Sequence, residues 1–297
     1  MKRRGAQRPQ HVFPDGARFR QHNLVLHARA QRHAVKDFPG PLSIKSVIDG
    51  EVGWIVDGRR LLVDERSFLV LNDGQKYSMD FDAPRPMETC CAFFQSGFVE
   101  QVAQDATSSV QTSLDAPVRQ VPALHFLSRL HRDQNHSMLP RLWSLAERCS
   151  QELQPSGFEE DFLVLSEKLV LLYEEITAQI ARVPGVRAST REELFRRLQR
   201  AREYMHSAAG EPLSLENVAK EACLSRYHLH RAFTKVFRQT PHAYLTTLRL
   251  ERAHDVIKRG RTVTEACTEV GFSSPSSFSR LFREHYGAPP SSVRKGQ

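Results

Sequence analysis

Residues 218–241 read VAKEACLSRYHLHRAFTKVFRQTP, and residues 266–290 read ACTEVGFSSPSSFSRLFREHYGAPP. The two stretches are copies of one pattern, with one extra residue in the second. The aligned pairs include Ser225 with Ser273, Arg231 with Arg280, Phe233 with Phe282, and Pro241 with Pro290. Each copy predicts a short helix, a tight turn and a longer helix with a basic exposed face. This is the pattern of a helix-turn-helix, whose second helix can enter a DNA major groove.

The excess positive charge of the chain lies entirely in the part that holds these copies. The 297 residues carry 42 Lys and Arg against 34 Asp and Glu, a net charge of +8. Residues 189–297 hold 19 basic and 11 acidic side chains, whereas residues 1–188 hold 23 of each. A basic domain is the electrostatic signature of phosphate binding. Together with the repeat, the charge predicts that residues 189–297 bind DNA.

Capping residues divide this region into helices. A capping box of Thr190 and Glu193 predicts a helix that runs to about His206. Pro241 and Gly260 bound a long connecting helix, because proline is favoured at the first helical position and glycine just beyond the last. The other predicted helix starts are Ser214, Ser225, Thr262 with Glu265, and Ser274 with Pro275.

Residues 38–95 carry the pattern of short antiparallel strands. Three Asp-Gly pairs begin at Asp49, Asp57 and Asp73, and Asp-Gly between apolar runs is a strong signal for a β-hairpin. Between and beside these turns lie the apolar segments LSIKSVI, EVGWIV, RRLLV and SFLVLN, and another apolar run spans Met87 to Phe94. Many short strands with regular turns predict a small antiparallel barrel or sandwich.

A helix with one apolar stripe follows the strands. Its apolar residues recur at steps of three and four, at 158, 162, 165, 169, 172, 176, 180 and 183. This spacing places them on one face of a helix of about 25 residues. The heptad-like run predicts self-association through the stripe. The alternative is that the stripe packs on the barrel of its own chain.

The tandem repeat, the connector YLTTLRLERAHDVI and the ending GFSSPSSFSRLFREHYGAPPSSVR resemble the AraC/XylS family of bacterial transcription regulators. The match covers about 105 residues, from Ser189 to Arg294. One departure is Arg238, where the family usually has glycine after the first recognition helix. The first half is similar to the family's sensor half, a cupin-like barrel with a dimerisation segment.

The pattern and the resemblance together predict an α+β chain of two domains. The N-terminal domain is a cupin-like antiparallel β-barrel with a helical dimerisation segment, and the C-terminal domain is all-α. We expect a basic flexible arm over 1–19, a sensor barrel over 20–116, a helical dimerisation and linker segment over 117–182, and an AraC-type DNA-binding domain with two helix-turn-helix units over 189–297.

The face of each recognition helix opposite its apolar residues supplies the candidate DNA contacts. The resemblance places base-edge contacts on Tyr227, His230 and Arg231, and arginine can grip guanine with two hydrogen bonds. The alternatives are that His230 is only solvated and that Arg231 contacts only phosphate. The complete candidate set is Arg226, Tyr227, His230, Arg231, Thr234 and Lys235 in the first copy, and Ser274, Ser276, Ser277, Ser279, Arg280 and Arg283 in the second.

Neither a metal site nor a catalytic site is expected. No histidine lies between Phe38 and Leu124, and His22, His27 and His33 precede the predicted strands, so imidazole ligands for a metal are missing from them. The five cysteines at 90, 91, 149, 223 and 267 lack the spacing of metal ligands. Cys90 and Cys91 could sense redox state or pack within a strand. No apolar run is long enough for a membrane span.

The barrel is then a binding pocket or a structural platform. Trp54, Tyr77, Arg59 and Lys76 are the candidate ligand-binding residues, and the alternative is that the aromatic residues fill the core. We expect a cytoplasmic, sequence-specific regulator, an effector-responsive activator without a cofactor or enzymatic activity. Its expected partners are promoter DNA, a small-molecule effector, a second copy of itself and, by the resemblance, RNA polymerase. The alternatives are a metal-dependent cupin enzyme fused to a DNA-binding module and a regulator whose barrel binds no ligand.

Overall fold

A computed structural model describes residues 18–107, 124–127, 129–133, 138–151, 155–211 and 213–293. The chain forms two compact units, and the division falls between Tyr173 and Glu174, inside helix α5 (Phe158–Ala181). The basic arm expected over 1–19 lies outside the described residues as far as residue 17, and Arg18–Gln21 form the short helix α1. The other domain limits given above stay predictions.

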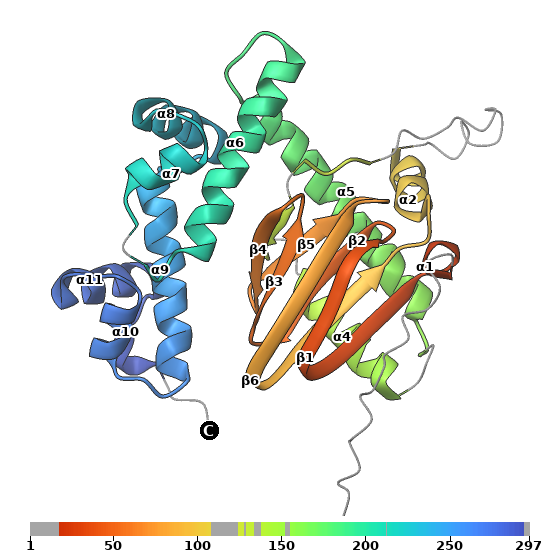
Figure 1. The fold of residues 1–297 in the computed structure, drawn as a ribbon, viewed down its shortest axis with the longest axis horizontal. Coiled ribbons are helices and arrows are strands. Elements are labelled where there is room, and N and C mark those ends of the chain that lie inside the picture. Colours follow the sequence, from red (N-terminus) through yellow and green to blue (C-terminus); the bar gives the residue numbers. More distant parts are fainter. Residues whose placement is uncertain are drawn as a thin grey trace, which may run out of the picture. The chain divides into compact units, whose positions relative to one another are not determined.

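The N-terminal unit contains a seven-stranded antiparallel sheet that curls into a nearly closed barrel (Figure 1). This confirms the predicted fold of the first domain. The strands follow the order β4-β3-β6-β2-β5-β7, and β1 pairs with β6. Their bounds are β1 Leu24–Pro39, β2 Ser43–Asp49, β3 Glu51–Val56, β4 Arg59–Asp64, β5 Ser67–Leu71, β6 Lys76–Phe93 and β7 Leu130–Arg132.

Strand β1 corrects the sequence prediction, which begins the β structure near residue 38. It pairs with β6 from Leu24, opposite Phe93, to Pro39, opposite Lys76. Alanine, arginine, glutamine and histidine fill much of β1, and side chains of this kind give little strand signal until a partner strand covers them. His27 and His33 therefore lie on a strand of the sheet and not before it.

The Asp-Gly pairs close one hairpin and not three. Asp57 and Gly58 both have positive φ, 49° and 72°, and they join β3 to β4 with Val56 opposite Arg59. This is the two-residue turn that the sequence predicts. Gly50 and Gly74 also have positive φ, but β2 pairs with β5 and β6, and β5 pairs with β2 and β7. The turns at Gly50 and Gly74 are therefore corners, which connect strands that are not paired with each other, β2 with β3 and β5 with β6.

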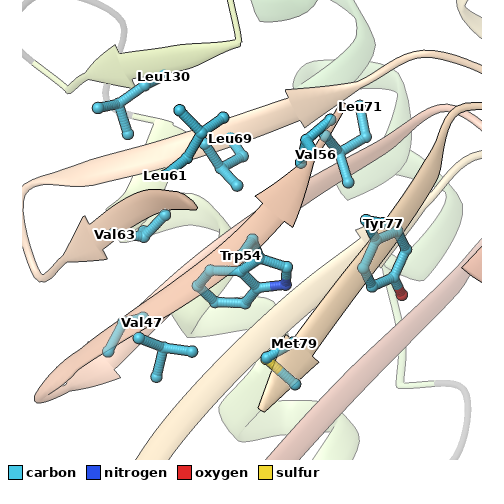
Figure 2. Packing of buried hydrophobic residues seen from close by; sticks show 11 residues of the cluster. Val47, Trp54, Val56, Leu61, Val63, Leu69, Leu71, Tyr77, Met79 and Leu130 are labelled. Carbon is cyan, nitrogen blue, oxygen red and sulfur yellow. The ribbon is translucent and has the colours of Figure 1, made fainter. Parts of the chain in front are cut away.

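The interior of the barrel is apolar. Trp54, Tyr77 and Met79 point into the same interior space, surrounded by aliphatic side chains from β2, β3, β4 and β5 (Figure 2). Trp54 is only 1% exposed. The outer face carries helix α4 (Met138–Gln151) and the first part of α5, and helix α2 (Phe98–Thr107) follows β6 in the chain.

Specific contacts hold α4 and α5 on that outer face. The Trp143 indole on α4 donates to the Ser46 hydroxyl at 3.4 Å, and the Cys90 thiol lies 3.8 Å from the Leu142 carbonyl oxygen. The rings of Phe94 and Phe162 meet edge to face with centroids 5.3 Å apart. Of the two interpretations of Cys90, a redox sensor or a packing residue, these contacts favour packing.

The apolar stripe of α5 is covered within the chain. Seven of its eight residues are at most 7% exposed: Phe158, Phe162, Leu165, Leu169, Leu172, Ile176 and Val183. Phe162 contacts Phe94 and Phe158, so this part of the stripe packs inside the N-terminal unit. The stripe is therefore not a free surface for a second copy, which corrects the expectation of self-association through it. The same spacing serves a coiled coil and a core helix.

The C-terminal unit consists of helices around a long central one, as the sequence predicts. Ser214, Ser225 and Ser274 cap α7, α8 and α11, and Thr262 with Glu265 forms a capping box at α10. The capping box predicted at Thr190 is wrong, because α6 already begins at Ala188. The helices are α6 Ala188–Ser207, α7 Leu215–Glu221, α8 Arg226–Phe237, α9 Pro241–Lys258, α10 Val263–Glu269 and α11 Pro275–Tyr286, followed by a 3-10 turn at Pro290–Ser292.

Left-handed backbone conformations recur at matching positions of the two copies. Gly271 and Gly287 have φ of 79° and 73°, and their counterparts Cys223 and Arg238 have φ of 53° and 59°. Glycine adopts this conformation without strain, whereas a residue with a Cβ atom does so at a cost. The first copy is therefore strained at two positions where the second is not.

The second copy allows this strain to be measured by substitution. We expect Gly287→Ala to lower the free energy of unfolding by about 1 kcal/mol, because the conformation disfavours a side chain and no atom lies within 4 Å of the new Cβ. Gly271→Ala should cost more, because its Cβ would lie 3.1 Å from a guanidinium nitrogen of Arg249. Urea unfolding of both variants tests this. Equal losses would show that the contact with Arg249 is harmless.

Candidate nucleic-acid interface and barrel cavity

Helix α8 presents one face to the core and the other to solvent. Leu229, Ala232, Phe233 and Val236 are buried. The Phe233 ring packs on Tyr244 of α9, with centroids 5.8 Å apart. This anchoring fixes which side chains point outward. The exposed candidates on α8 are Arg226, Tyr227, His230, Arg231 and Lys235.

The exposed face of α8 is basic and aromatic. The helix contains no acidic residue, and Tyr227 is 74% exposed. A large aromatic ring left in water at this position is available to contact a base. Two residues outside the candidate set, His228 and Arg238, are also exposed at the ends of the helix. Their positions beside the helix caps could have identified them from the sequence.

Thr234 does not join this surface. The residue is half-buried, and its hydroxyl oxygen is buried without a hydrogen-bond partner among the described residues. It follows the buried Phe233 in the helix and precedes Lys235, so it sits at the border between the two faces. A hydroxyl in this position is withdrawn from a ligand that approaches the exposed face.

Helix α11 offers a weaker basic surface than α8. Its N-terminal serines are engaged with each other: the Ser274 hydroxyl accepts from the Ser277 backbone N–H at 3.3 Å and lies 3.0 Å from the Ser276 hydroxyl. Arg280 donates to the Glu284 carboxylate at 2.6 Å. The buried Phe278 and Phe282 orient the helix. Of the remaining candidates Ser277 and Arg283 are exposed, and Ser279 is half-buried.

Helix α9 packs in the cores of both copies and so joins them rigidly. Its first half contributes Tyr244, Leu245 and Leu248 to the buried residues beside α8, and its second half enters the core of the second copy with Leu250, Ala253, Val256 and Ile257. Arg249, between these halves, donates to the carbonyl oxygens of Ala209 and Glu211 at 3.1 and 3.0 Å. Partial burial lowers the pKa of Arg249. One continuous helix thus fixes the spacing of the two exposed recognition faces.

The barrel contains a cavity of about 160 Å³ that is partly open to solvent. An engineered protein cavity of about 150 Å³ lined by aliphatic and aromatic side chains binds benzene, so this volume suits a small ligand. Trp54 and Tyr77 line the cavity as the sequence suggested, whereas Arg59 and Lys76 do not. The lining comes mainly from β1 and β6: Leu26, His27, Ala28, Ala30, His33, Val35, Trp54, Tyr77, Met79, Phe81, Met87, Thr89, Cys91 and Phe93.

Lys45 is the charged group of the barrel interior that the sequence analysis missed. Its side chain is fully buried, and the ammonium lies 3.5 Å from the centre of the Phe93 ring and 4.6 Å from that of Tyr77. Burial lowers the pKa of Lys45 to about 8, and the neighbouring Cys91 opposes that effect. Burial also raises the pKa of both Tyr77 and Cys91. A lysine inside the apolar strand segment SIKSVI was the signal available in the sequence.

Imidazoles are present in the barrel after all, because His27 and His33 lie on β1. His27 is paired with the Glu88 carboxylate at 2.8 Å. Within the described ranges, no three His, Cys, Asp or Glu side chains are grouped as metal ligands would be. None of the helices in the described part of the chain is long and apolar enough to cross a membrane.

Comparison with known proteins finds similarity in the C-terminal unit. A family model described as a helix-turn-helix domain matches residues 218–296. The HTH-type transcriptional regulator GbdR of Pseudomonas aeruginosa is 34% identical over 102 residues, and the match covers 34% of this chain but only 28% of GbdR.

Two further proteins are similar to this chain. The uncharacterized HTH-type transcriptional regulator YbfI of Bacillus subtilis is 25% identical over 236 residues, which are 76% of this chain and 77% of YbfI. A solved structure of a probable AraC family transcriptional regulator from Rhodopseudomonas palustris is 26% identical, with a TM-score of 0.32. It covers 33% of this chain and 93% of its own. Helices α7 and α8, helices α10 and α11, and the match of the helix-turn-helix family model together confirm the tandem helix-turn-helix predicted from the repeat.

The buried ammonium of Lys45 should make the stability of the barrel depend on pH. Below about pH 8 the group is charged in both the folded and the unfolded chain, so folding bears the full cost of burying it. Between about pH 8 and 10.5 the folded state binds fewer protons than the unfolded state, so this cost fades as pH rises.

We therefore expect Lys45→Met to raise the free energy of unfolding at pH 7, by on the order of 2–3 kcal/mol. The gain should shrink steadily towards pH 10. Urea unfolding of wild type and variant at each pH measures the difference. Lys76→Met, which removes an exposed lysine, is the control and should change little. A gain that stays constant from pH 7 to 10 would contradict the prediction.

Proposed function

We propose that this chain is a DNA-binding transcriptional regulator of the AraC/XylS family that recognises promoter sequences mainly through α8, and that it responds to a small molecule held in its barrel. The observation that carries the first part is the acid-free exposed face of α8, with Tyr227 and Arg231 on it. The observation that carries the second is the apolar cavity lined mainly by the inward-facing side chains of β1 and β6.

Base recognition is assigned to the first copy because its arginine has no acidic neighbour on the helix. Arg231 is followed four residues later by Lys235, whereas Arg280 is followed by Glu284, with which it forms an ion pair. Arg280 would have to break its ion pair with Glu284 before it could donate both hydrogen bonds to guanine. The serines of α11 suit phosphate and water-mediated contacts. We therefore assign base reading to Tyr227, His230 and Arg231, and mainly backbone contacts to α11.

The resemblance to the family is the reason for proposing that an effector regulates the protein and that the protein activates transcription. In this proposal the protein acts in the cytoplasm, where it contacts promoter DNA and RNA polymerase and has no enzymatic activity. The competing proposal of a metal-dependent cupin enzyme draws little support from the barrel, whose interior is lined mostly by apolar side chains. A regulator with an unliganded barrel is the second alternative, and the buried cation described below argues against it.

The assignment of roles to the two recognition helices is tested on DNA. Purified full-length protein is mixed with fragmented genomic DNA, and the bound fragments are sequenced to define the preferred site. We expect Arg231→Ala to cost about 1–3 kcal/mol of specific affinity and to relax the base preference at one position. Arg280→Ala should cost less, because its guanidinium already has Glu284 as a partner.

The result for random DNA separates base reading from phosphate contact. Arg231→Ala should weaken binding to the preferred site more than binding to random DNA, and the wild-type affinity should fall steeply with salt. Equal losses on both kinds of DNA would show that Arg231 only contacts phosphate. Failure to enrich any genomic fragment would contradict the proposed function.

Self-association is proposed through the outer face of α5. Leu163 and Leu171 are 45% and 52% exposed, and Val164 and Val170 between them are half-buried. The two leucines are eight residues apart and share one side of the helix with the exposed Glu167, which lies four residues from each. Two such faces can cover each other across a two-fold axis, in which the same patch is used on both copies.

We expect the double variant Leu163→Glu with Leu171→Glu to be monomeric in light scattering and to keep the circular dichroism of the folded protein. The exposed side chains can be charged without disturbing the core. Leu169→Glu is the matched control on the buried face, and it should unfold the N-terminal unit because Leu169 is fully buried. A double variant that remains dimeric would exclude this face.

A further inference from the structure

Among the described residues, no hydrogen-bond acceptor contacts the ammonium of Lys45. Lys45 lies on the inner face of β2, paired with Cys91 of β6 on one side and with Leu69 of β5 on the other. The residue is fully buried, and its Nζ has no hydrogen-bond partner among the described residues. A buried charge is normally paired, because its transfer out of water is costly.

Aromatic rings account for only part of this arrangement. The ammonium lies over the faces of Phe93 and Tyr77, at 3.5 and 4.6 Å from the ring centres. Such contacts attract a cation electrostatically. They do not supply the acceptor that each N–H requires, because a ring face has no lone pair directed at it. Among the described residues, the Lys45 ammonium therefore has aromatic contacts but no negatively charged hydrogen-bond acceptor.

The cavity lies directly beside this incomplete site. Phe93, Tyr77 and Cys91 line the cavity and also surround Lys45. Lys45 itself is not among the lining residues, so its ammonium is separated from the cavity by these side chains. The four-carbon stem of lysine is flexible, and a small movement of a ring would bring Nζ into contact with a ligand.

The composition of the cavity defines the class of ligand. Its walls are mostly aliphatic and aromatic, and its volume of about 160 Å³ suits one ring or a short alkyl chain. Apart from His27 and His33 on β1, no basic residue lines it, so the Lys45 ammonium beside the cavity can balance a single negative charge. A phosphate dianion would keep an unpaired charge in an apolar space, whereas a monocarboxylate would not.

We propose that the barrel cavity binds a small apolar monocarboxylate whose carboxylate pairs with the Lys45 ammonium, with its apolar part against Trp54, Met79 and Phe81. This rests on the proposed role of the barrel as an effector pocket and specifies what that pocket recognises. Arg59 and Lys76, the cations suggested by the sequence, have no part in it.

The test compares acids with their uncharged amides on the full-length protein. Isothermal titration calorimetry is carried out with phenylacetate and phenylacetamide, and with hexanoate and hexanamide. Each pair has nearly the same shape and differs in charge. We expect at least one of the acids to bind, and its amide to bind at least about tenfold more weakly, because only the acid can neutralise the buried cation.

Two variants locate the interaction. Lys45→Met should abolish acid binding while the protein remains folded, because the substitution removes a buried charge. Lys76→Met removes an exposed lysine of the same sheet and should leave acid binding unchanged. Lys45→Gln is the second variant, and it should also lose the preference for acid over amide.

The outcomes are decisive in both directions. Equal binding of acid and amide, or acid binding retained in Lys45→Met, would overturn the proposal. It would also be overturned if neither acid bound a wild-type protein that still enriches its preferred genomic fragments. That last result leaves the proposed DNA-binding function intact, so the two failures can be told apart.

Discussion

The N-terminal unit depends on the pairing of one long strand with three others. Strand β6 pairs with β1 along one edge, while its other edge is shared by β3, opposite Tyr77 to Met79, and β2, opposite Glu88 to Phe93. Between these two regions lie Pro84 and Pro86, which lack a backbone N–H and could not complete a ladder there. The register of β1 also shifts at this point, between Ala30 and Arg32. The prolines thus fall in the part of the strand where the sheet changes partner.

This pairing creates both the cavity and its unusual cation. Because side chains alternate across a strand, the same ladder directs Met87, Thr89, Cys91 and Phe93 inward. The opposite face of β6 carries Cys90 against α4. The strand register also places Lys45 opposite Cys91 and therefore inside the barrel. A shift of one residue would move the lysine to the face covered by α4.

In the C-terminal unit the equivalent constraint is the single helix α9, whose two halves belong to the two cores. The two copies packed around α9 have the same fold, but the exposed side chains of their recognition helices differ in charge and in ion pairing. The first has a basic α8 and two residues other than glycine in left-handed conformations, Cys223 and Arg238. The second has glycines at those positions and an arginine paired with glutamate. The duplicated framework therefore supports two different surfaces, of which the first is the more suited to reading bases.

The sequence alone determined the features that depend on local chemistry. The tandem repeat, the serine caps and the Asp57-Gly58 hairpin all follow from residues a few positions apart, and the helix-turn-helix surface follows from them. Tertiary structure decided whatever depends on a distant partner. Strand β1 forms because β6 pairs with it, and two of the three Asp-Gly turns became corners because their flanking strands pair elsewhere. The first part of the α5 stripe packs inside the N-terminal unit, where Phe162 contacts Phe94. Lys45 became a buried cation because the register of β2 turned it inward, and periodicity along a single strand cannot show which face another strand will cover.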